Sequence, residues 1–413
     1  MSSSTHDVVV VGGGLAGVRR ALDAAAAGLS PLVLEAAPTV GGRMRTERVD
    51  GFRIDRGFQV LLTAYPEARA VLDYDALDLK PFDPGAVVRV GGRFARVGDP
   101  LRRPSDLFST LRAPVGTLRD KLRLLSLRRR VLRQEDRVAA AETTDAYLRN
   151  EGFSEAMIER FLRPWFGGVF LDRGLSASAS LFRFYLAMFA RGDTAVPAEG
   201  IGAVPRQLAD RLPEGAVRTG SPVATVRPGL VRLETGEEVR ARAVVVATEA
   251  TAAARLLDTP RPVPGPSVAS FWFSAPEPPL RGPRLVLDGE GRGPVNDLAV
   301  LSEVAPSYAP PGRALIVANV PGAGANRAGL AGAVHDQLAE WFGDAVAQWR
   351  LLKAFTIREA LPRQRPEDLA SRAGPRIASG LYLAGDHCAS GSLQGALASG
   401  RRAAEAVRED LAA

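Results

Sequence analysis

The stretch VVVVGGGLAGVRRALDAAAAGLSPLVLEA, residues 8–36, decides the fold class of this chain. Its apolar beginning is too short for a helix, so residues 7–11 are expected to form a buried parallel strand. Gly12, Gly14 and Gly17 then follow with the spacing G-x-G-x-x-G. In that spacing the first glycine makes a tight turn, the second lets a pyrophosphate approach the backbone, and the third lets the helix pack on the strand. A helix over residues 15–27 would point its positive N-terminal end at the phosphates.

A second strand follows the helix and ends in an acid. Gly28 stops the helix, and PLVLE, residues 31–35, leads to Glu35, which lies 18 residues beyond Gly17. An acid at this place hydrogen-bonds a ribose hydroxyl and repels a 2′-phosphate, which disfavours NADP. Strand, turn, helix, strand and acid together predict a dinucleotide site. The residues expected to contact the dinucleotide in this segment are Gly12, Gly14, Leu15, Ala16, Gly17 and Glu35.

Composition places the chain among ordinary globular proteins. It has 413 residues, of which 46% are hydrophobic and 24% charged, enough for a large core and about two domains. No apolar run reaches the roughly 18 residues that span a bilayer, and the start MSSSTHD lacks the features of a signal peptide. The lone cysteine, Cys388, excludes an internal disulfide and fits a reducing, cytoplasmic location. With three histidines in the chain, we expect no Cys/His metal site.

The net charge of +7 is unevenly distributed. Only three of the 53 basic residues are lysine, which indicates a compositional preference for arginine. Residues 101–137 hold 11 basic and 4 acidic side chains, a surplus equal to that of the whole chain. Because no nucleic-acid motif surrounds this segment, we do not expect nucleic acid as a partner.

The segment GGRMRT, residues 41–46, carries a family resemblance. Gly41, Gly42, Arg43 and Thr46 match the pattern G-G-R-x-x-T, which follows the ribose acid in the flavoprotein superfamily of amine oxidases, protoporphyrinogen oxidases and phytoene desaturases. The chain resembles that superfamily, and the resemblance implies FAD as cofactor. It also implies that Arg43 lies near the pyrophosphate or the flavin, where a guanidinium can bind phosphate oxygens in pairs.

Two internal segments are similar to the same superfamily. GIGAVPRQLADRLP, residues 200–213, resembles the segment that returns the chain to the FAD domain. The strand after it begins near Val223, whose backbone contacts adenine in relatives. A further strand ends at Ala247 and Thr248, like the family's A-T-G turn, although Glu249 stands where the family has glycine.

The C-terminal segment GLYLAGDHCASGSLQGALASGRRAAEAV, residues 380–407, resembles the last FAD motif of the superfamily. The resemblance implies that Asp386 contacts the ribityl or pyrophosphate side of FAD, and that a small-residue helix including Gly395 lies against the flavin ring. The N-terminal dipole of such a helix would stabilise negative charge on the flavin. His387 and Cys388 are interpreted as structural. The residues implied as cofactor contacts here are Gly385, Asp386, Leu393, Gln394 and Ala396.

The resemblance implies an α/β fold with a doubly wound, Rossmann-like FAD-binding domain interleaved with an α+β substrate domain. Residues 1–75, 200–260 and 375–413 would form the FAD-binding domain, and residues 76–199 and 261–374 the substrate domain. Apolar patterns predict that 76–199 is mainly helical. They also predict strands at 267–275, 284–288 and 313–320 and a helix at 332–343.

Several features bear on the reaction. Many amine oxidases of this family have a lysine near the flavin in the second substrate segment, yet residues 261–310 contain none. Lys353, Trp272 and Gln59 are weak candidates for a place beside the flavin. We assign no catalytic acid or base, since a hydride can pass directly to the flavin. The aromatic residues that could line an apolar pocket are Trp165, Phe166, Tyr185, Phe189, Phe271, Trp272 and Phe273.

The sequence therefore favours an FAD-dependent oxidoreductase acting on a hydrophobic alkene-, polyene- or porphyrinogen-like molecule, with oxygen or another electron acceptor. The alternatives are an amine or amino-acid oxidase, and a flavoprotein that keeps FAD for structure or partner binding. The oligomeric state is left open.

Residues 117–133 are predicted to form a basic amphipathic helix. Leu118, Leu122, Leu125 and Leu132 share one face, and seven basic residues surround it. Such a helix can lie on an anionic bilayer and admit an apolar substrate from lipid. The alternative, which is the commoner outcome, is that the leucines pack on the substrate domain and the arginines face solvent.

Overall fold

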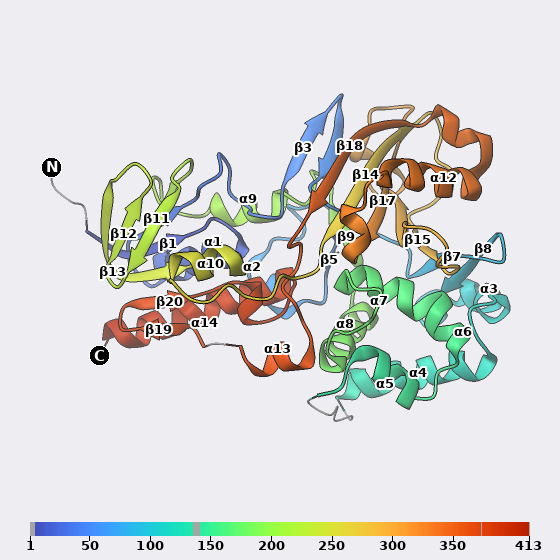
Figure 1. The fold of residues 1–413 in the computed structure, drawn as a ribbon, viewed down its shortest axis with the longest axis horizontal. Coiled ribbons are helices and arrows are strands. Elements are labelled where there is room, and N and C mark those ends of the chain that lie inside the picture. The colour runs from blue at the N-terminus through green and yellow to red at the C-terminus, as the bar shows by residue number, and fades with distance from the viewer. Residues whose placement is uncertain (1–4, 135–140, 373, 413) are drawn as a thin grey trace.

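The computed structural model describes residues 5–134, 141–372 and 374–412 (Figure 1). Two large sheets lie side by side, and a group of helices lies beneath the second sheet in the view of Figure 1. The described part of the chain begins and ends beside the first sheet. Within the described ranges, no helix is both long enough and apolar enough to cross a bilayer.

The first sheet contains the expected strand–helix–strand unit. Strands β1 (Thr5–Val11) and β2 (Pro31–Leu34) pair in parallel and are joined by helix α1 (Leu15–Ala26). Strand β13 (Glu238–Val246) lies in parallel on the other side of β1, and its C-terminal half pairs with β20 (Leu381–Leu383). The other strands of this sheet are β10 (Val217–Arg218), β11 (Val223–Arg227), β12 (Leu230–Leu233) and β19 (Arg376–Ala378).

Both faces of this sheet are covered, which explains the unbroken valine run. Val8 and Val10 pack toward α1 and α14 (Leu393–Ala412), while Val9 and Val11 pack toward the β11–β12 hairpin and α10 (Ala250–Leu256). A strand buried on both faces has no polar side, so its sequence does not alternate.

The second sheet has seven strands in the order β18-β14-β17-β16-β15-β7-β8, antiparallel except for the β15–β7 pair. Helix α12 (Leu330–Phe342) packs on one face with Val334, Leu338 and Trp341. The strands are β7 (Gly85–Val90), β8 (Arg93–Gly98), β14 (Val268–Ala275), β15 (Leu285–Asp288), β16 (Asp297–Val300), β17 (Ala314–Pro321) and β18 (Arg350–Ile357).

The described residues of the segment 76–199 are mainly helical between 104 and 191, whereas the first part of the segment and residues 194–197 form strands. Strands β7 and β8 are a hairpin turned by Gly91 and Gly92, both with positive φ, and the hairpin completes the edge of the second sheet. The helices of this segment are α3 (Leu107–Arg112), α4 (Leu118–Arg133), α5 (Thr144–Asn150), α6 (Glu155–Met157), α7 (Arg163–Phe170) and α8 (Ala179–Arg191).

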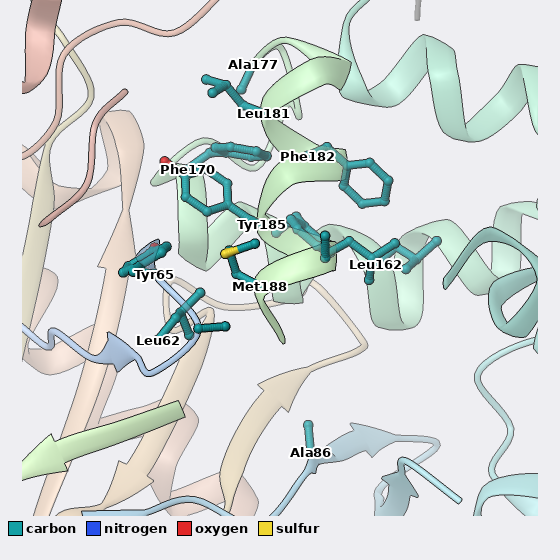
Figure 2. Packing of buried hydrophobic residues seen from close by; sticks show 14 of the residues in the cluster. Leu62, Tyr65, Ala86, Leu162, Phe170, Ala177, Leu181, Phe182, Tyr185 and Met188 are labelled. Atoms are coloured by element: carbon teal, nitrogen blue, oxygen red, sulfur yellow. The ribbon is translucent and has the colours of Figure 1, made fainter. Parts of the chain in front are cut away.

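Helix α8 is the centre of the largest apolar cluster. Tyr185 and Met188 of α8 lie beside Leu62 and Tyr65, which come from the N-terminal part of the chain (Figure 2). This packing connects the helical group to the first 75 residues.

The remaining strands and α-helices are β3 (Thr46–Val49), β4 (Phe52–Asp55), β5 (Leu61–Leu62), β6 (Leu79–Pro81), β9 (Thr194–Pro197), α2 (Pro66–Val71), α9 (Ala203–Ala209), α11 (Leu301–Val304) and α13 (Pro366–Ala370).

Candidate cofactor and substrate site

A cavity of about 780 Å³ runs from the first sheet to the helical group. At one end it is lined by Gly12, Glu35 and Ala247, each of which directly follows a parallel strand of the first sheet, and by Gly385, two residues after the end of β20. At the other end it reaches α4 and α8. In doubly wound sheets, ligands bind beyond the carboxyl ends of the strands, and this cavity occupies that place.

The three glycines of the first turn have different surroundings. Gly12 has a φ of +109°, and a Cβ there would approach the carbonyl oxygen of Ala247 to 2.8 Å. At Gly17 a Cβ would overlap the carbonyl oxygen of Gly12, so this glycine sets how closely α1 approaches β1. Gly14 lines the cavity, and a Cβ there would meet no protein atom within 4 Å. Gly14 therefore leaves open space on the cavity side, as a backbone that cradles a ligand must.

The start of α1 has free hydrogen-bonding capacity. Gly14 is its N-cap, no side chain caps it, and its first turn holds no acidic residue. Leu15 and Ala16 of this first turn line the cavity. The orphan N–H groups and the positive end of the helix dipole therefore face the cavity and suit an anionic group such as a pyrophosphate.

Glu35 is held by two backbone donors. One carboxylate oxygen accepts from Gly13 N at 2.6 Å and the other from Ala37 N at 2.8 Å. The side chain is buried at the cavity wall. Each oxygen retains a lone pair for a further donor, so the carboxylate can accept from ribose hydroxyls.

Arg43 bridges the two ends of the chain. Its Nη2 lies 2.6 Å from an oxygen of Asp386, and its Nη1 donates to Ala360 O at 2.8 Å. Burial alone would lower the pKa of this guanidinium, but the adjacent Asp386 carboxylate raises it overall. Both side chains line the cavity, together with Gly41 and Gly42. The ion pair thus presents a fixed charge of each sign to a ligand.

Thr46, the last residue of the matched G-G-R-x-x-T pattern, has a structural role. Its hydroxyl donates to Asp55 at 2.6 Å and accepts from Gly202 N at 2.9 Å. It does not line the cavity. The motif therefore joins the N-terminal segment to the segment that returns to the first sheet near residue 200.

The C-terminal motif supplies a second helix start at the cavity. Leu393 and Ala396 in the first turn of α14 line the cavity, and that turn contains no acidic residue. Gly395 does not line it, since a Cβ there would overlap the carbonyl oxygen of Ser390. The expected contact of Gly395 with the ligand is thus replaced by a contact with the preceding loop.

Glu249, which stands where relatives have glycine, has a structural role. Its carboxylate accepts from Thr251 N and Ala252 N and caps α10.

Three further residues expected at the cofactor lie away from the cavity wall. Gly17 packs against β1, Val223 is buried in the core beside β12, and the Gln394 amide oxygen accepts from Glu67 N at 2.9 Å. In each case the side chain or Cα faces protein. The cofactor candidates that line the cavity are Gly12, Gly14, Leu15, Ala16, Glu35, Gly41, Gly42, Arg43, Ala247, Gly385, Asp386, Leu393 and Ala396.

Of the weak catalytic candidates, Gln59 alone lines the cavity. Its amide nitrogen donates to the carbonyl oxygens of Arg43 and Arg56 at 3.0 and 3.1 Å. Trp272 is fully buried on the far side of β14, and the Lys353 ammonium lies 3.1 Å from Glu47. Neither of these two side chains reaches the cavity.

The part of the cavity beyond the glycine turns has mainly apolar walls. Trp165, Tyr185 and Phe189 line it as expected, whereas Phe166, Phe271 and Phe273 are buried in the core instead. Further apolar lining comes from Phe161, Leu186, Leu285, Leu287 and Ile357. A molecule in this part would contact mainly carbon atoms.

Sequence reasoning missed a buried polar group in this apolar wall. Asp297 and Asn319 line the cavity, and Asp297 accepts from the side-chain amides of Asn319 at 2.7 Å and Asn296 at 3.0 Å. Burial raises the pKa of the Asp297 carboxyl, although the two amide donors oppose this effect. One signal in the sequence could have shown this polar group. The segment NDLAV, residues 296–300, begins with two polar residues and continues as an apolar strand.

Two further titratable groups of the C-terminal motif follow Asp386: His387 is half-buried and Cys388 is buried. Burial lowers the pKa of His387, which lines a separate cavity of about 240 Å³ beside Arg43 and Asp386. Burial raises the pKa of the Cys388 thiol to about 11. Among the described residues, no group of three or more His, Cys, Asp or Glu side chains could hold a metal ion.

A family model described as flavin-containing amine oxidoreductase matches residues 15–408. The chain is 51% identical to hydroxyneurosporene desaturase of Rubrivivax gelatinosus over 53 residues, which are 13% of this chain and 10% of that protein. It is 43% identical to pseudooxynicotine dehydrogenase of a Pseudomonas species over 56 residues, 14% of this chain and 11% of that protein. The chain therefore spans about a tenth of the length of these two relatives.

Among solved structures, an oxidoreductase from Methanosarcina mazei superposes with a TM-score of 0.77 and 17% identity. The superposition covers 98% of this chain and 100% of that one. At this identity the likeness concerns the fold alone.

Proposed function

This chain belongs to the family of flavin-containing amine oxidoreductases, and from that membership we infer that it is an FAD-dependent oxidoreductase whose substrate is hydrophobic and alkene-, polyene- or porphyrinogen-like. A hydride leaves the substrate, and oxygen or another acceptor takes the electrons in turn. When bound, a flavin supplies a two-electron acceptor that can receive a hydride directly from carbon. Residues 1–75, 200–260 and 375–413 are proposed as the FAD-binding domain, and the rest as the substrate domain.

The observation that carries this proposal is the continuity of the cavity. Its first part has the uncapped start of α1, the start of α14, Glu35 and the Arg43–Asp386 pair, which suit an extended ligand with a pyrophosphate and a ribose. Its second part is walled by aromatic and aliphatic side chains and suits an apolar substrate. A dinucleotide in the first part would end where the apolar part begins.

The chain's own residues would bind and orient rather than exchange protons. The N-termini of α1 and α14 stabilise negative charge on the cofactor, and Gln59 fixes the backbone of Arg43 at the cavity wall. The apolar walls exclude water from the substrate. His387 lies in the separate smaller cavity, so it is not assigned as an acid or base.

An amine or amino-acid oxidase is the second candidate function, and Asp297 favours it. A carboxyl group in an apolar wall can pair with a substrate cation, which a hydrocarbon could not offer. The same carboxyl can accept a hydrogen bond from a neutral hydroxyl group.

Anaerobic titration of the purified yellow protein separates these functions. Loss of the flavin absorption band with polyenes, alkenes or porphyrinogens is expected, and reduction by amines alone would replace the first proposal with the second. A tightly bound flavin that no member of the panel reduces would leave FAD in a structural role and overturn both.

A substitution then tests the second candidate. If amines reduce the flavin, Asp297→Asn should raise their KM by roughly tenfold or more, because a buried charge pair is lost. Asp83→Asn is the matched control, since Asp83 also lines the cavity but is paired with Arg103 and Arg284. An equal effect of both substitutions would refute a specific role for Asp297.

A further inference from the structure

One surface patch contains most of the large apolar side chains that the described residues expose. Its members, here called the α3–α4 patch, are between 45% and 62% exposed. They are Leu101, Leu107, Phe108, Leu111, Leu118 and Leu122. The other exposed large apolar residues, Val263, Leu351 and Ile377, lie on different elements. Four of the six, Leu107, Leu111, Leu118 and Leu122, line the same cavity and so lie near one another. Clustered exposed apolar surface marks an interaction site more often than scattered residues do.

The orientation of α4 explains why these leucines are outside. The helix turns Leu124, Leu127 and Val131 toward the core and α8, and Thr117 and Asp120 form a capping box that fixes its first turn. The N-terminal half of the stripe expected from the sequence therefore faces outward: Leu118 and Leu122 are each 59% exposed, whereas Leu125 and Leu132 are half-buried. The described chain leaves more than half of the surface of Leu118 and of Leu122 uncovered.

The charge around the patch is positive. Arg112 lies over the Phe108 ring at 3.8 Å, and Arg119 is exposed on α4. The Lys121 ammonium donates to the carbonyl oxygens of Leu111 and Ala113, which hold it in place without neutralising it. The two acidic residues between positions 101 and 133, Asp106 and Asp120, are both buried and hydrogen-bonded.

The patch also surrounds an opening of the cavity. Leu107, Leu111, Leu118 and Leu122 are exposed, yet they also line the cavity. Residues that do both mark the place where the cavity meets the surface. From there the wall continues inward past Trp165 and the other apolar side chains to the glycine turns.

We propose that the α3–α4 patch docks on the surface of an anionic lipid bilayer. The apolar side chains enter the boundary between headgroups and acyl chains, and Arg112, Arg119 and Lys121 contact anionic headgroups. The cavity then opens into lipid, so an apolar substrate reaches it without crossing water. The docking itself does not depend on which substrate the enzyme oxidises.

Charge decides between lipid and a second copy of the chain as the occupant. A symmetric dimer through this patch would bring the same three basic residues of both copies together, and their positive charges would repel one another. An anionic bilayer offers the opposite charge over the whole patch. The arginines farther along α4 contribute less, since Arg128 is paired with Asp99 and Arg130 with Glu151.

Vesicle flotation with the flavin-loaded protein tests the proposal. The wild type should float with phosphatidylcholine vesicles that contain phosphatidylglycerol, remain unbound with pure phosphatidylcholine, and release as salt rises. Arg112→Glu/Arg119→Glu should lower the partition coefficient roughly tenfold or more. Leu118→Ser/Leu122→Ser should abolish flotation even at low salt, where the electrostatic attraction is strongest.

Matched controls keep the test specific. Arg240→Glu/Arg408→Glu reverses two exposed arginines on the first sheet and α14, and Leu351→Ser/Ile377→Ser replaces exposed apolar residues elsewhere. Both controls should float like the wild type, and flavin absorption reports that every variant is folded. Absence of wild-type binding at low salt overturns the proposal, as does equal loss in the controls. If the wild type does not bind vesicles but forms a dimer, and Leu118→Ser/Leu122→Ser converts that dimer to monomer, the patch is an interface between two copies of the chain instead.

Discussion

At the scale of single residues, the glycines of the G-x-G-x-x-G motif have different physical roles in this site. Gly17 has no room for a Cβ because the Gly12 carbonyl oxygen occupies the space, whereas Gly14 faces the open cavity. The same spacing motif thus combines one residue that the fold requires with one that the ligand requires.

Gly14→Ala and Gly17→Ala should therefore fail in different ways. Gly14→Ala should change the free energy of unfolding of the apoprotein by less than about 1 kcal/mol, yet weaken FAD binding at least roughly tenfold. Gly17→Ala should destabilise the apoprotein by about 1–3 kcal/mol through overpacking. Denaturant unfolding and FAD titration of the apoproteins measure both quantities, and equal stability losses would contradict the assignment.

Glu35 is the residue expected to accept from the ribose. Glu35→Ala should weaken FAD binding by about 1.5–3 kcal/mol, because charged hydrogen bonds to the ribose are lost. Glu35→Gln, which keeps the volume and one acceptor oxygen, should lie between this variant and the wild type. Fluorescence titration of the apoproteins with FAD measures the affinities, and an unchanged affinity for Glu35→Ala would place the ribose elsewhere.

At the scale of elements, a buried carboxyl joins three segments that lie far apart in the chain. Asp55 at the end of β4 accepts from Thr46 at 2.6 Å, from Ile201 N at 3.0 Å and from the Tyr308 hydroxyl at 2.9 Å. Its burial raises the pKa to about 6 despite these donors. The hairpin of β3 and β4 is thereby held against the 200–202 turn and the turn at Tyr308.

The raised pKa of Asp55 predicts that the stability of the chain depends on pH. The folded chain keeps the proton of Asp55 up to about pH 6, while the unfolded chain releases it near the ordinary pKa of 3.8. The free energy of unfolding should therefore fall by up to about 3 kcal/mol as the pH rises from about 4 to above 6. Asp55→Asn should lack this component, although it loses hydrogen bonds at every pH. Urea unfolding of both proteins at pH 4, 5, 6 and 7 measures the difference, and parallel curves would refute it.

At the scale of the whole molecule, the cavity joins both sheets and the helical group. Its wall includes the strand ends of the first sheet, strands β15–β17 of the second, and α4, α7 and α8. A ligand there contacts elements of both sheets and of the helical group, so its binding free energy contributes to the stability of the assembled chain.

Removal of the cofactor should accordingly lower the melting temperature. Added FAD at about 100 times its Kd should restore about 2.7 kcal/mol of stability. FMN should restore less, because it lacks the adenosine ribose that Glu35 is placed to accept. Calorimetry of the apoprotein with each flavin measures this, and equal restoration by FMN would show that the Glu35 end of the cavity is not used.

Much of the first sheet and its turns could be predicted from the sequence. Strand β1, helix α1, strand β2 and Glu35 lie within one or two residues of their expected places, and the C-terminal motif meets them across the cavity. These features depend on local chemistry: a glycine turn, a short apolar run and an acid at a strand end act through their immediate neighbours.

Only the tertiary structure decided which sides of the later elements face inward. Trp272 points into the core and Lys353 toward Glu47 because strand pairing sets which face of β14 and β18 is covered. The outward face of α4 depends on where α8 packs, and the Asp297–Asn319 pair depends on the register of β16 and β17. Such choices rest on contacts between residues far apart in the chain, and a local pattern shows that a side chain is apolar or polar without showing what covers it.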